Sequence, residues 1–236
     1  MKDESRFWDR IAKKYYQTPV KDQDAYEKKL EITRSYFQKD MKVLEFGCGT
    51  GSTAVAHAPF VEQITAIDIS QNMLDYADEQ ARAAGVDNVR FRKGSIETFD
   101  AEVGSFDVIM GMSVLHLVDD REAVLNKVMQ LLKPGGVFIS STACMGDKLK
   151  FLKYIIPIGR AVGLLPLVRF FTQQQLVDDL ENSGFRIDRR WLPDGAVAVF
   201  IVASKEQVVA GIEDTEPQAS NTGIDDSNGT MTAAPL

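Results

Sequence analysis

The stretch VLEFGCGTGSTA, at positions 43–54, constrains the fold of this chain more than any other. An apolar run of strand type leads directly into a turn with glycines at 47, 49 and 51, and the residues after the turn suit the start of a helix. Glycines at this spacing let backbone N–H groups approach an anion, to which the N-terminus of the next helix adds its positive dipole end. The stretch therefore predicts an α/β fold that binds a ligand at the end of its first strand.

Apolar strands and amphipathic helices alternate through the rest of the chain. Each strand is nearly all apolar, which is typical of a parallel sheet covered on both faces. We expect a Rossmann-like, doubly wound, mostly parallel seven-stranded sheet with helices on both faces and an antiparallel last strand. The expected strands are 42–46, 63–69, 89–94, 106–111, 136–143, 185–192 and 196–204, and the expected helices are 7–16, 25–38, 52–58, 71–84, 120–132 and 172–183.

Composition divides the chain into three parts. Residues 1–40 are expected to form a helical leader or cap, 41–205 the main domain, and 206–236 a disordered acidic tail that is rich in small polar residues. Residues 205–236 hold one base and six acids, a balance of −5, so the other 204 residues carry −2 of the total charge of −7. A main domain without an excess of Lys and Arg does not suit nucleic acid, so no nucleic-acid partner is expected.

The cysteine count, the first residues and the length of the apolar runs favour a cytoplasmic protein. Two cysteines cannot form a disulfide framework. The first sixteen residues are charged and lack the apolar run of a signal peptide, and no apolar run reaches the ~18 residues of a spanning helix.

Glu45 limits what the glycine turn can bind. A carboxylate beside a pyrophosphate is unfavourable, whereas a carboxylate beside an ammonium is favourable. The dinucleotide fingerprint would also need Gly or Ala at position 52, where this chain has Ser52. An amino-acid zwitterion fits both observations. Asp68, at the end of the second strand and about 20 residues beyond the turn, suits the two hydroxyls of a ribose. A ligand with both ends is S-adenosylmethionine.

S-adenosylmethionine is the ligand of a large enzyme family that this sequence resembles. The family is the class I S-adenosylmethionine-dependent methyltransferases, and the resemblance is to their small-molecule or lipid branch. The stretches that carry the resemblance follow the family's order over residues 40–145, and FWDRIAKKY before them resembles the family's leader. They are VLEFGCGTG, AIDIS with QNML after it, FRKGSIE, FDVIMGMSVLH and LLKPGG.

The resemblance implies a set of cofactor contacts and no metal ligands. The methionine end, the ribose, the adenine and the reactive end would each be held by residues that follow a different strand, with one residue of the leader closing over them. In that order, the residues are Glu45, Gly47, Cys48, Gly49 and Gly51; Asp68; Ile69, Met73, Ser95 and Ile96; Met112; and Tyr15 of the leader. Serine at position 95 departs from the aspartate that many relatives carry.

His116 is the candidate catalytic residue. It follows the fourth strand in SVLHLVDD, where this fold opens its active site. A general base is wanted there if the acceptor is a hydroxyl, a thiol or an acidic carbon. Lining the pocket or orienting the substrate is the other interpretation. His57 is expected to be a surface or packing residue, and Cys48 a small loop filler.

The acceptor is expected to be small, and lipid-like or quinone-like. The motif GMSVLH lacks the Asn/Asp-Pro-Pro-aromatic signature that relatives use on amide or amino nitrogens. Residues 147–171 are apolar and basic, broken by prolines and glycines, and in this family the segment often covers the substrate pocket. Such a lid suits an acceptor with an anionic part, or peripheral contact of 148–171 with the inner membrane surface. It could instead only pack on the core or form a dimer contact.

Three alternatives remain at this stage. They are a methyltransferase of a soluble metabolite, a NAD-dependent oxidoreductase, and a regulator that binds the cofactor without turnover. The sequence does not specify the acceptor atom or the oligomeric state.

Overall fold

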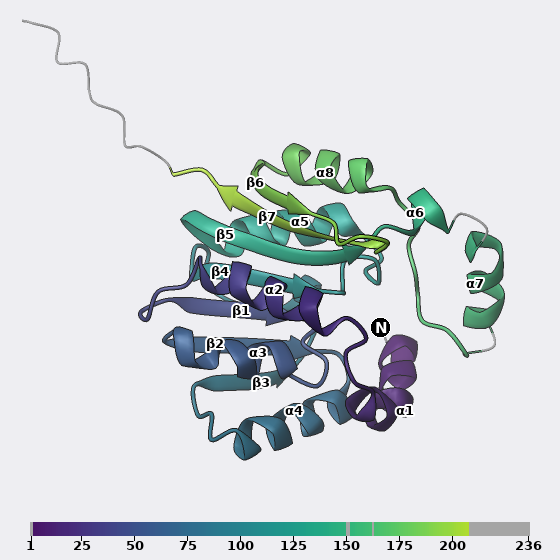
Figure 1. Ribbon diagram of the computed structural model, residues 1–236, viewed down its shortest axis with the longest axis horizontal. Coiled ribbons are helices and arrows are strands. Elements are labelled where there is room, and N and C mark those ends of the chain that lie inside the picture. Colours follow the sequence, from purple (N-terminus) through teal and green to yellow (C-terminus); the bar gives the residue numbers. More distant parts are fainter. Residues whose placement is uncertain (1, 150–151, 162, 208–236) are drawn as a thin grey trace, which may run out of the picture.

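A seven-stranded sheet forms the centre of the protein (Figure 1). The computed structural model describes residues 2–149, 152–161 and 163–207. The strand order is β3-β2-β1-β4-β5-β7-β6, and β7 runs antiparallel to both of its neighbours while the other neighbouring pairs are parallel. The predicted doubly wound sheet with an antiparallel last strand is confirmed. The strands are β1 Lys42–Phe46, β2 Gln63–Asp68, β3 Val89–Lys93, β4 Phe106–Met112, β5 Leu132–Ala143, β6 Phe185–Trp191 and β7 Ala198–Lys205.

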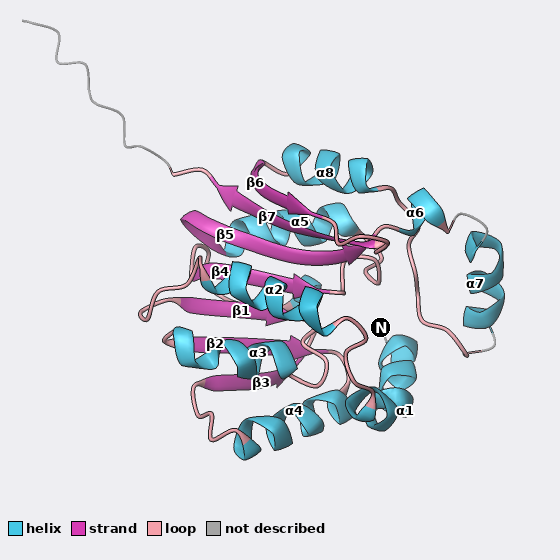
Figure 2. Ribbon diagram, in the orientation of Figure 1, coloured by secondary structure: helices cyan, strands magenta, loops and turns pink. Residues whose placement is uncertain are grey.

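Helices cover both faces of the sheet (Figure 2). One hydrophobic cluster joins the sheet to α5 and α8 through Leu125 and Leu180, and a second joins the other face to α2 and α3 through Ile32 and Ala54. The helices are α1 Lys2–Gln17, α2 Gln23–Arg34, α3 Ser52–His57, α4 Gln71–Ala83, α5 Arg121–Leu131, α6 Met145–Lys148, α7 Leu152–Ala161 and α8 Gln173–Asn182, with 3₁₀ turns η1 Ala58–Phe60 and η2 Ile96–Thr98.

The topology fixes where a ligand can bind. The strand order reverses between β1 and β4, because the chain first builds outward through β2 and β3 and then returns to the other side of β1. In open α/β sheets the ligand crevice lies beyond the carboxyl ends of the strands at this switch point. The glycine turn follows β1 and therefore lies at this crevice.

Several predicted boundaries were wrong. The helix expected at 25–38 begins at Gln23, because the Asp22 carboxylate accepts the Ala25 N–H at 2.9 Å, and it ends at Arg34 in tight turns. The first helix begins at Lys2 rather than at residue 7. The fifth strand begins at Leu132, which pairs with Phe106, and an irregularity in the register absorbs the Pro-Gly-Gly turn that was expected to precede it.

One further segment differs from the expectation, and another lies outside the residues that the structure describes. The segment expected to be broken by Pro157 instead contains α7, with Pro157 inside the helix. The predicted disordered tail lies, from residue 208 onward, outside the described residues.

The close packing of β4 on β1 is testable at Gly111. A Cβ on Gly111 would lie 2.7 Å from the ring of Phe46. Because overpacking a filled core costs about 1–3 kcal/mol, Gly111→Ala should lower the free energy of unfolding by about that amount, measured by urea denaturation. Gly94→Ala is the matched control, since its Cβ would meet nothing within 4 Å. Equal unfolding midpoints for the two variants would contradict the packing described.

Candidate active site

The glycine turn leaves room for backbone alone. Gly47 and Gly51 have positive φ angles of 65° and 79°. A Cβ would lie 2.5 Å from Val114 Cγ2 at Gly47 and 2.7 Å from Ala77 Cβ at Gly51. The turn is fixed to β2 by a bond from the Cys48 N–H to the carbonyl of Ile67 at 3.1 Å. The result is a rigid cradle of main chain at the end of β1.

Glu45 is buried, and no basic side chain of the described residues forms an ion pair with it. Its side chain is 1% exposed, and Oε2 has no hydrogen-bond partner in the described part of the chain. Burial, and secondarily the charge of Asp68, raises the pKa of Glu45 to about 8. A buried carboxyl group without a partner is costly, and a ligand that brings a positive hydrogen-bond donor removes that cost. Glu45 therefore fits the ammonium of an amino acid.

Asp68 is held in position by the main chain around it. Oδ2 accepts the Gly49 N–H and Oδ1 accepts the Ser70 N–H, each at 2.9 Å. Burial raises the pKa of Asp68, and the N–H bonds from Ser70, Gly49 and Ile69 oppose that rise. A carboxylate has about four acceptor sites, so beside these three N–H bonds Asp68 can still accept a hydroxyl of a ribose.

The first helix covers this site. Asp9 of α1 accepts the Ser70 hydroxyl at 2.6 Å and the Asn72 N–H at 3.1 Å, which fastens α1 to the start of α4. Tyr15 lies over the turn, with Cε1 at 3.7 Å from the place of a Cβ on Gly49. Half of Tyr15 is exposed, so it closes the site only in part. Burial of its hydroxyl end, and then the charges of Asp68 and Glu45, raise the pKa of Tyr15.

Most predicted cofactor residues lie together at the carboxyl ends of the strands, and two of them, Met73 and Ile96, are more deeply buried than Ser95, Ile69 and Met112. Ser95 and Ile69 are half-buried beside Asp68, since the Gly94 N–H bonds the Asp68 carbonyl at 2.9 Å. Met112 is half-buried at the end of β4. Met73 and Ile96 are almost fully buried, as Glu45 and Asp68 are, and their contact with an adenine stays a prediction.

Cys48 and the two histidines are electrically neutral near pH 7. Burial, followed by the charges of Glu45 and Asp68, raises the pKa of Cys48, so the thiol is not an activated nucleophile. Burial lowers the pKa of His116 to about 4, and its buried Nδ1 has no partner among the described residues. His57 is fully buried edge-on against Phe37, so of its two expected roles packing is correct and surface is wrong.

Sequence reasoning missed two side chains of α2. Tyr26 hydrogen-bonds Thr53, and the Glu45 charge adds to the burial that raises the pKa of Tyr26. Lys29 Nζ donates to Ser141 Oγ at 3.0 Å. The available signal was helical spacing, because Tyr26 and Lys29 lie three apart and Leu30 and Thr33 continue the same face. Nothing local shows that this face meets the end of the sheet.

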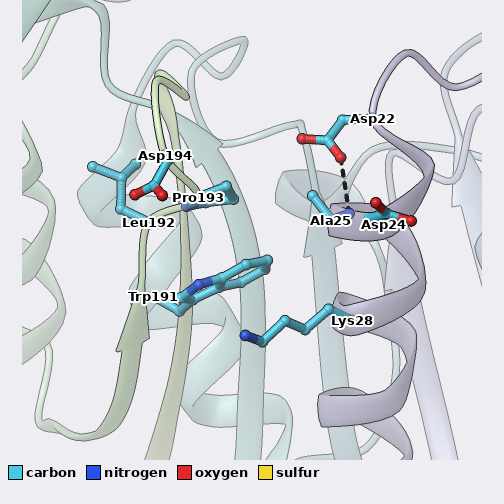
Figure 3. Close-up of a pocket in the computed structure, with 8 residues that line it drawn as sticks. All are labelled: Asp22, Asp24, Ala25, Lys28, Trp191, Leu192, Pro193 and Asp194. Atoms are coloured by element: carbon cyan, nitrogen blue, oxygen red, sulfur yellow. Dashed lines mark hydrogen bonds between the residues drawn. The ribbon is translucent and has the colours of Figure 1, made fainter.

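The described residues also form two cavities away from Glu45 and Asp68. One, of about 360 Å³, lies between the start of α2 and the β6–β7 turn (Figure 3). There the Lys28 ammonium lies 4.8 Å from the centre of the Trp191 ring. The other, of about 770 Å³, lies between the start of α5 and residues 168–171. Neither includes the glycine turn, so the buried carboxylates rather than these cavities locate the site.

The fold and the buried acids together define a class of protein, the class I methyltransferases, with a site of the S-adenosylmethionine type. The chain belongs to the family described as "Methyltransferase domain", whose model matches residues 37–188. The predictions of family, enzyme class and cofactor are thereby confirmed at the level of the family.

Relatives and solved structures agree with this assignment. The chain is 32% identical over 110 residues to the uncharacterized methyltransferase YcgJ of Bacillus subtilis, covering 47% of this chain and 44% of the relative. It is 34% identical over 126 residues to a ubiquinone biosynthesis O-methyltransferase of Paracidovorax citrulli, covering 53% and 52%. The chain thus spans about half the length of these curated relatives.

Two solved structures share the fold at low sequence identity. The crystal structure of YcgJ superposes with a TM-score of 0.64 at 18% identity, covering 77% of this chain and 99% of that one. A geranyl diphosphate methyltransferase in complex with GPP and sinefungin superposes with a TM-score of 0.62 at 16% identity, covering 76% and 77%.

The protonation of Glu45 predicts a pH-dependent stability. Between the unfolded pKa near 4.5 and the folded pKa of about 8, the folded protein keeps a proton that the unfolded chain releases. Stability from this group is therefore full below pH 4.5 and is lost as the pH rises to about 8. The melting temperature of the ligand-free protein should fall across this window more steeply than that of Glu45→Gln. Glu97→Gln, at an exposed position, should follow the wild type. Parallel curves for all three proteins would contradict a buried, protonated Glu45.

Proposed function

We propose that this chain is an S-adenosylmethionine-dependent methyltransferase whose acceptor is a small, apolar or amphiphilic molecule, with a lipid or quinone-like compound favoured. The observation that carries the methyltransferase assignment is the unpartnered carboxylate of Glu45 beside the glycine cradle, one strand away from the fixed carboxylate of Asp68. A dinucleotide would bring a pyrophosphate to a place that already holds a buried acid.

Each residue of the site would do one physical task. Glu45 would accept the ammonium of the cofactor, the glycine turn would offer N–H groups to its carboxylate, and Asp68 would accept the ribose hydroxyls. Tyr15 of α1, which lies over the glycine turn, would exclude water from the cofactor. When bound, S-adenosylmethionine supplies a methyl group that its positive sulfonium makes electrophilic. The protein's remaining task is to align the acceptor and keep water away.

His116 is the proposed base for an acceptor that must lose a proton. It follows β4, and its unpartnered Nδ1 together with a pKa near 4 leaves the imidazole neutral, with a free lone pair at neutral pH. A pKa that low makes it a weak base. Orienting the acceptor by a hydrogen bond remains the second role that the same geometry supports.

The segment 147–171 supports an apolar acceptor or a membrane surface. In Figure 1, α7 stands away from the sheet, and the Arg160 guanidinium of α7 forms an ion pair with Glu4 of α1 at 3.2 Å. Ile155, Ile158 and Leu164 expose 53%, 69% and 66% of their surface, and Lys148, Lys153 and Arg160 lie in the same segment. Exposed apolar side chains among bases are typical of contact with an anionic lipid surface. None of the helices in the described part of the chain has the length and apolar character needed to span a bilayer.

The relatives support the same acceptor class by name. One is a ubiquinone biosynthesis O-methyltransferase, and one solved neighbour methylates geranyl diphosphate according to its name. The second candidate, a methyltransferase of a soluble metabolite, would need no lipid contact from α7. A regulator that binds the cofactor without turnover would share the buried acids and differ only in activity.

Cofactor binding is the first test. S-adenosylhomocysteine should bind the wild type in calorimetric titration, and NAD should not. Asp68→Asn should weaken binding roughly tenfold to a hundredfold, because a hydrogen bond to a charged group contributes about 1.5–3 kcal/mol. Asp75→Asn, on the exposed side of α4, is the matched control. Binding of NAD alone would reject the assignment, and tight cofactor binding without turnover on lipid, quinol and soluble acceptors would favour the regulator.

The lipid surface is tested separately. The protein should sediment with vesicles of equal parts phosphatidylglycerol and phosphatidylcholine, and much less with phosphatidylcholine alone. Replacing Ile155, Ile158 and Leu164 by Gln should reduce the bound fraction about tenfold or more, since burial of one such side chain contributes about 1.5–3 kcal/mol. Val103→Gln removes an equally exposed apolar side chain elsewhere and should change nothing. Unchanged sedimentation of the triple variant would favour the soluble acceptor.

A further inference from the structure

One row of side chains runs across the sheet from Glu45 on β1, through β4, to Ser141 on β5. Glu45 on β1 is paired with Met110 on β4, and Met112, two residues further on, is paired with Ser141 on β5. Since strand side chains alternate between faces, Glu45, Met112 and Ser141 all point to the same face. Met110, Met112 and Ile32 of α2 belong to one hydrophobic cluster, so this is the face that α2 covers.

The cofactor and its acceptor would lie over different strands along this row. Glu45 and Asp68 place the cofactor over β1 and β2. Neighbouring strands lie ~4.8 Å apart and a strand rises ~3.3 Å per residue, so Ser141, two strands across and two residues further along, is about 12 Å from Glu45, on the side opposite Asp68. The Ser113 N–H bonds the carbonyl of Ser141 at 2.7 Å, which ties the ends of β4 and β5 together. With the cofactor over β1 and β2, the ends of β4 and β5 are the part of the switch-point crevice that we assign to the acceptor.

Lys29 brings a positive charge to that place. Its Nζ donates to Ser141 Oγ at 3.0 Å, and the lysine is half-buried while Ser141 is buried. Among the described residues, Lys29 forms no ion pair with a carboxylate. Burial lowers the pKa of Lys29, and the charge of Asp22, on the same helix, opposes that change. An ammonium whose contact is one neutral hydroxyl, at a partly dry position, is suited to an anionic ligand.

We propose that Lys29, supported by Ser141, binds an acidic oxygen of the acceptor, of the phenol or enol class, beside the place of methyl transfer. The inference rests on the proposed function, since it takes the cofactor site as given. The ammonium favours the ionised oxygen, which is the better nucleophile, and it fixes which oxygen of the acceptor faces the cofactor. An acceptor with only aliphatic hydroxyl groups gains much less from this contact.

The neighbouring lysine shows why the assignment falls on Lys29. Lys28 lies over the ring of Trp191 and lines the cavity of Figure 3. The carboxylates of Asp22, Asp24 and Asp194 line the same cavity, so it does not suit an anion. Lys29 is not one of the lining residues. Lys28→Met is therefore a matched control that removes an adjacent ammonium outside the proposed contact.

The test is a titration followed by NMR on the full chain with ¹³C-labelled lysine and saturating S-adenosylhomocysteine. Catechol is the acidic probe, and cyclohexane-1,2-diol is the probe that cannot ionise. The Cε signals of Lys29 and Lys28 are assigned by their loss in Lys29→Met and Lys28→Met. Catechol should shift the Lys29 signal saturably and leave that of Lys28 unchanged, and the aliphatic diol should shift neither.

The variants separate charge from packing. Lys29→Met should weaken catechol binding tenfold or more while S-adenosylhomocysteine affinity, which also reports correct folding, stays unchanged. Lys29→Arg keeps the charge and should stay within a few-fold of the wild type, and Lys28→Met should match the wild type. Normal S-adenosylhomocysteine binding with an unmoved Lys29 signal, or equal catechol affinity in Lys29→Met, overturns this proposal alone. Absence of S-adenosylhomocysteine binding in the wild type overturns the proposed function itself.

Discussion

The site depends on one buried acid, Glu45, with which no basic side chain of the described residues forms an ion pair. Glu45 lies near the centre of the sheet, with β2 on one side of its strand and β4 on the other, and its nearest influential charge is another acid, Asp68. The ligand-free protein responds by holding a proton on Glu45. A cationic ligand group would displace that proton, so ligand binding and proton release are coupled at the point where the main chain opens into the glycine cradle.

The first two helices complete a site whose motifs lie in the sheet. The family model begins at residue 37, yet Tyr15 and Tyr26 face the buried acids from α1 and α2. Asp9 fastens α1 to Ser70, two residues after Asp68 at the end of β2. Under the proposed function, the region outside the family match would supply the cover of the cofactor site and, through Lys29, a charge beside the acceptor. Variation in these helices would change specificity without touching any family motif.

Features that depend on local sequence were predictable, and features that depend on how elements meet were not. The glycine turn, the acid at the end of β2 and the alternation of strands and helices follow from neighbouring residues. The start of β5 did not, because it is set by the pairing of Leu132 with Phe106, far away in the chain. The burial of Met73 and Ile96 was not predictable either, because it depends on how their helical turns pack against the sheet. The position of Lys29 depends on how α2 crosses the sheet, which no local pattern contains.

The reversed direction of β7 places the end of the described chain far from the site. Lys205, the last residue of β7, donates to the carbonyls of Met129 and Leu132, at the end of α5 and the start of β5. The strand of eight residues spans about 25 Å, so its end lies at the edge of the sheet opposite the glycine turn. A dye, an affinity handle or a solid support attached after this strand would leave the entrance for small molecules facing the solution.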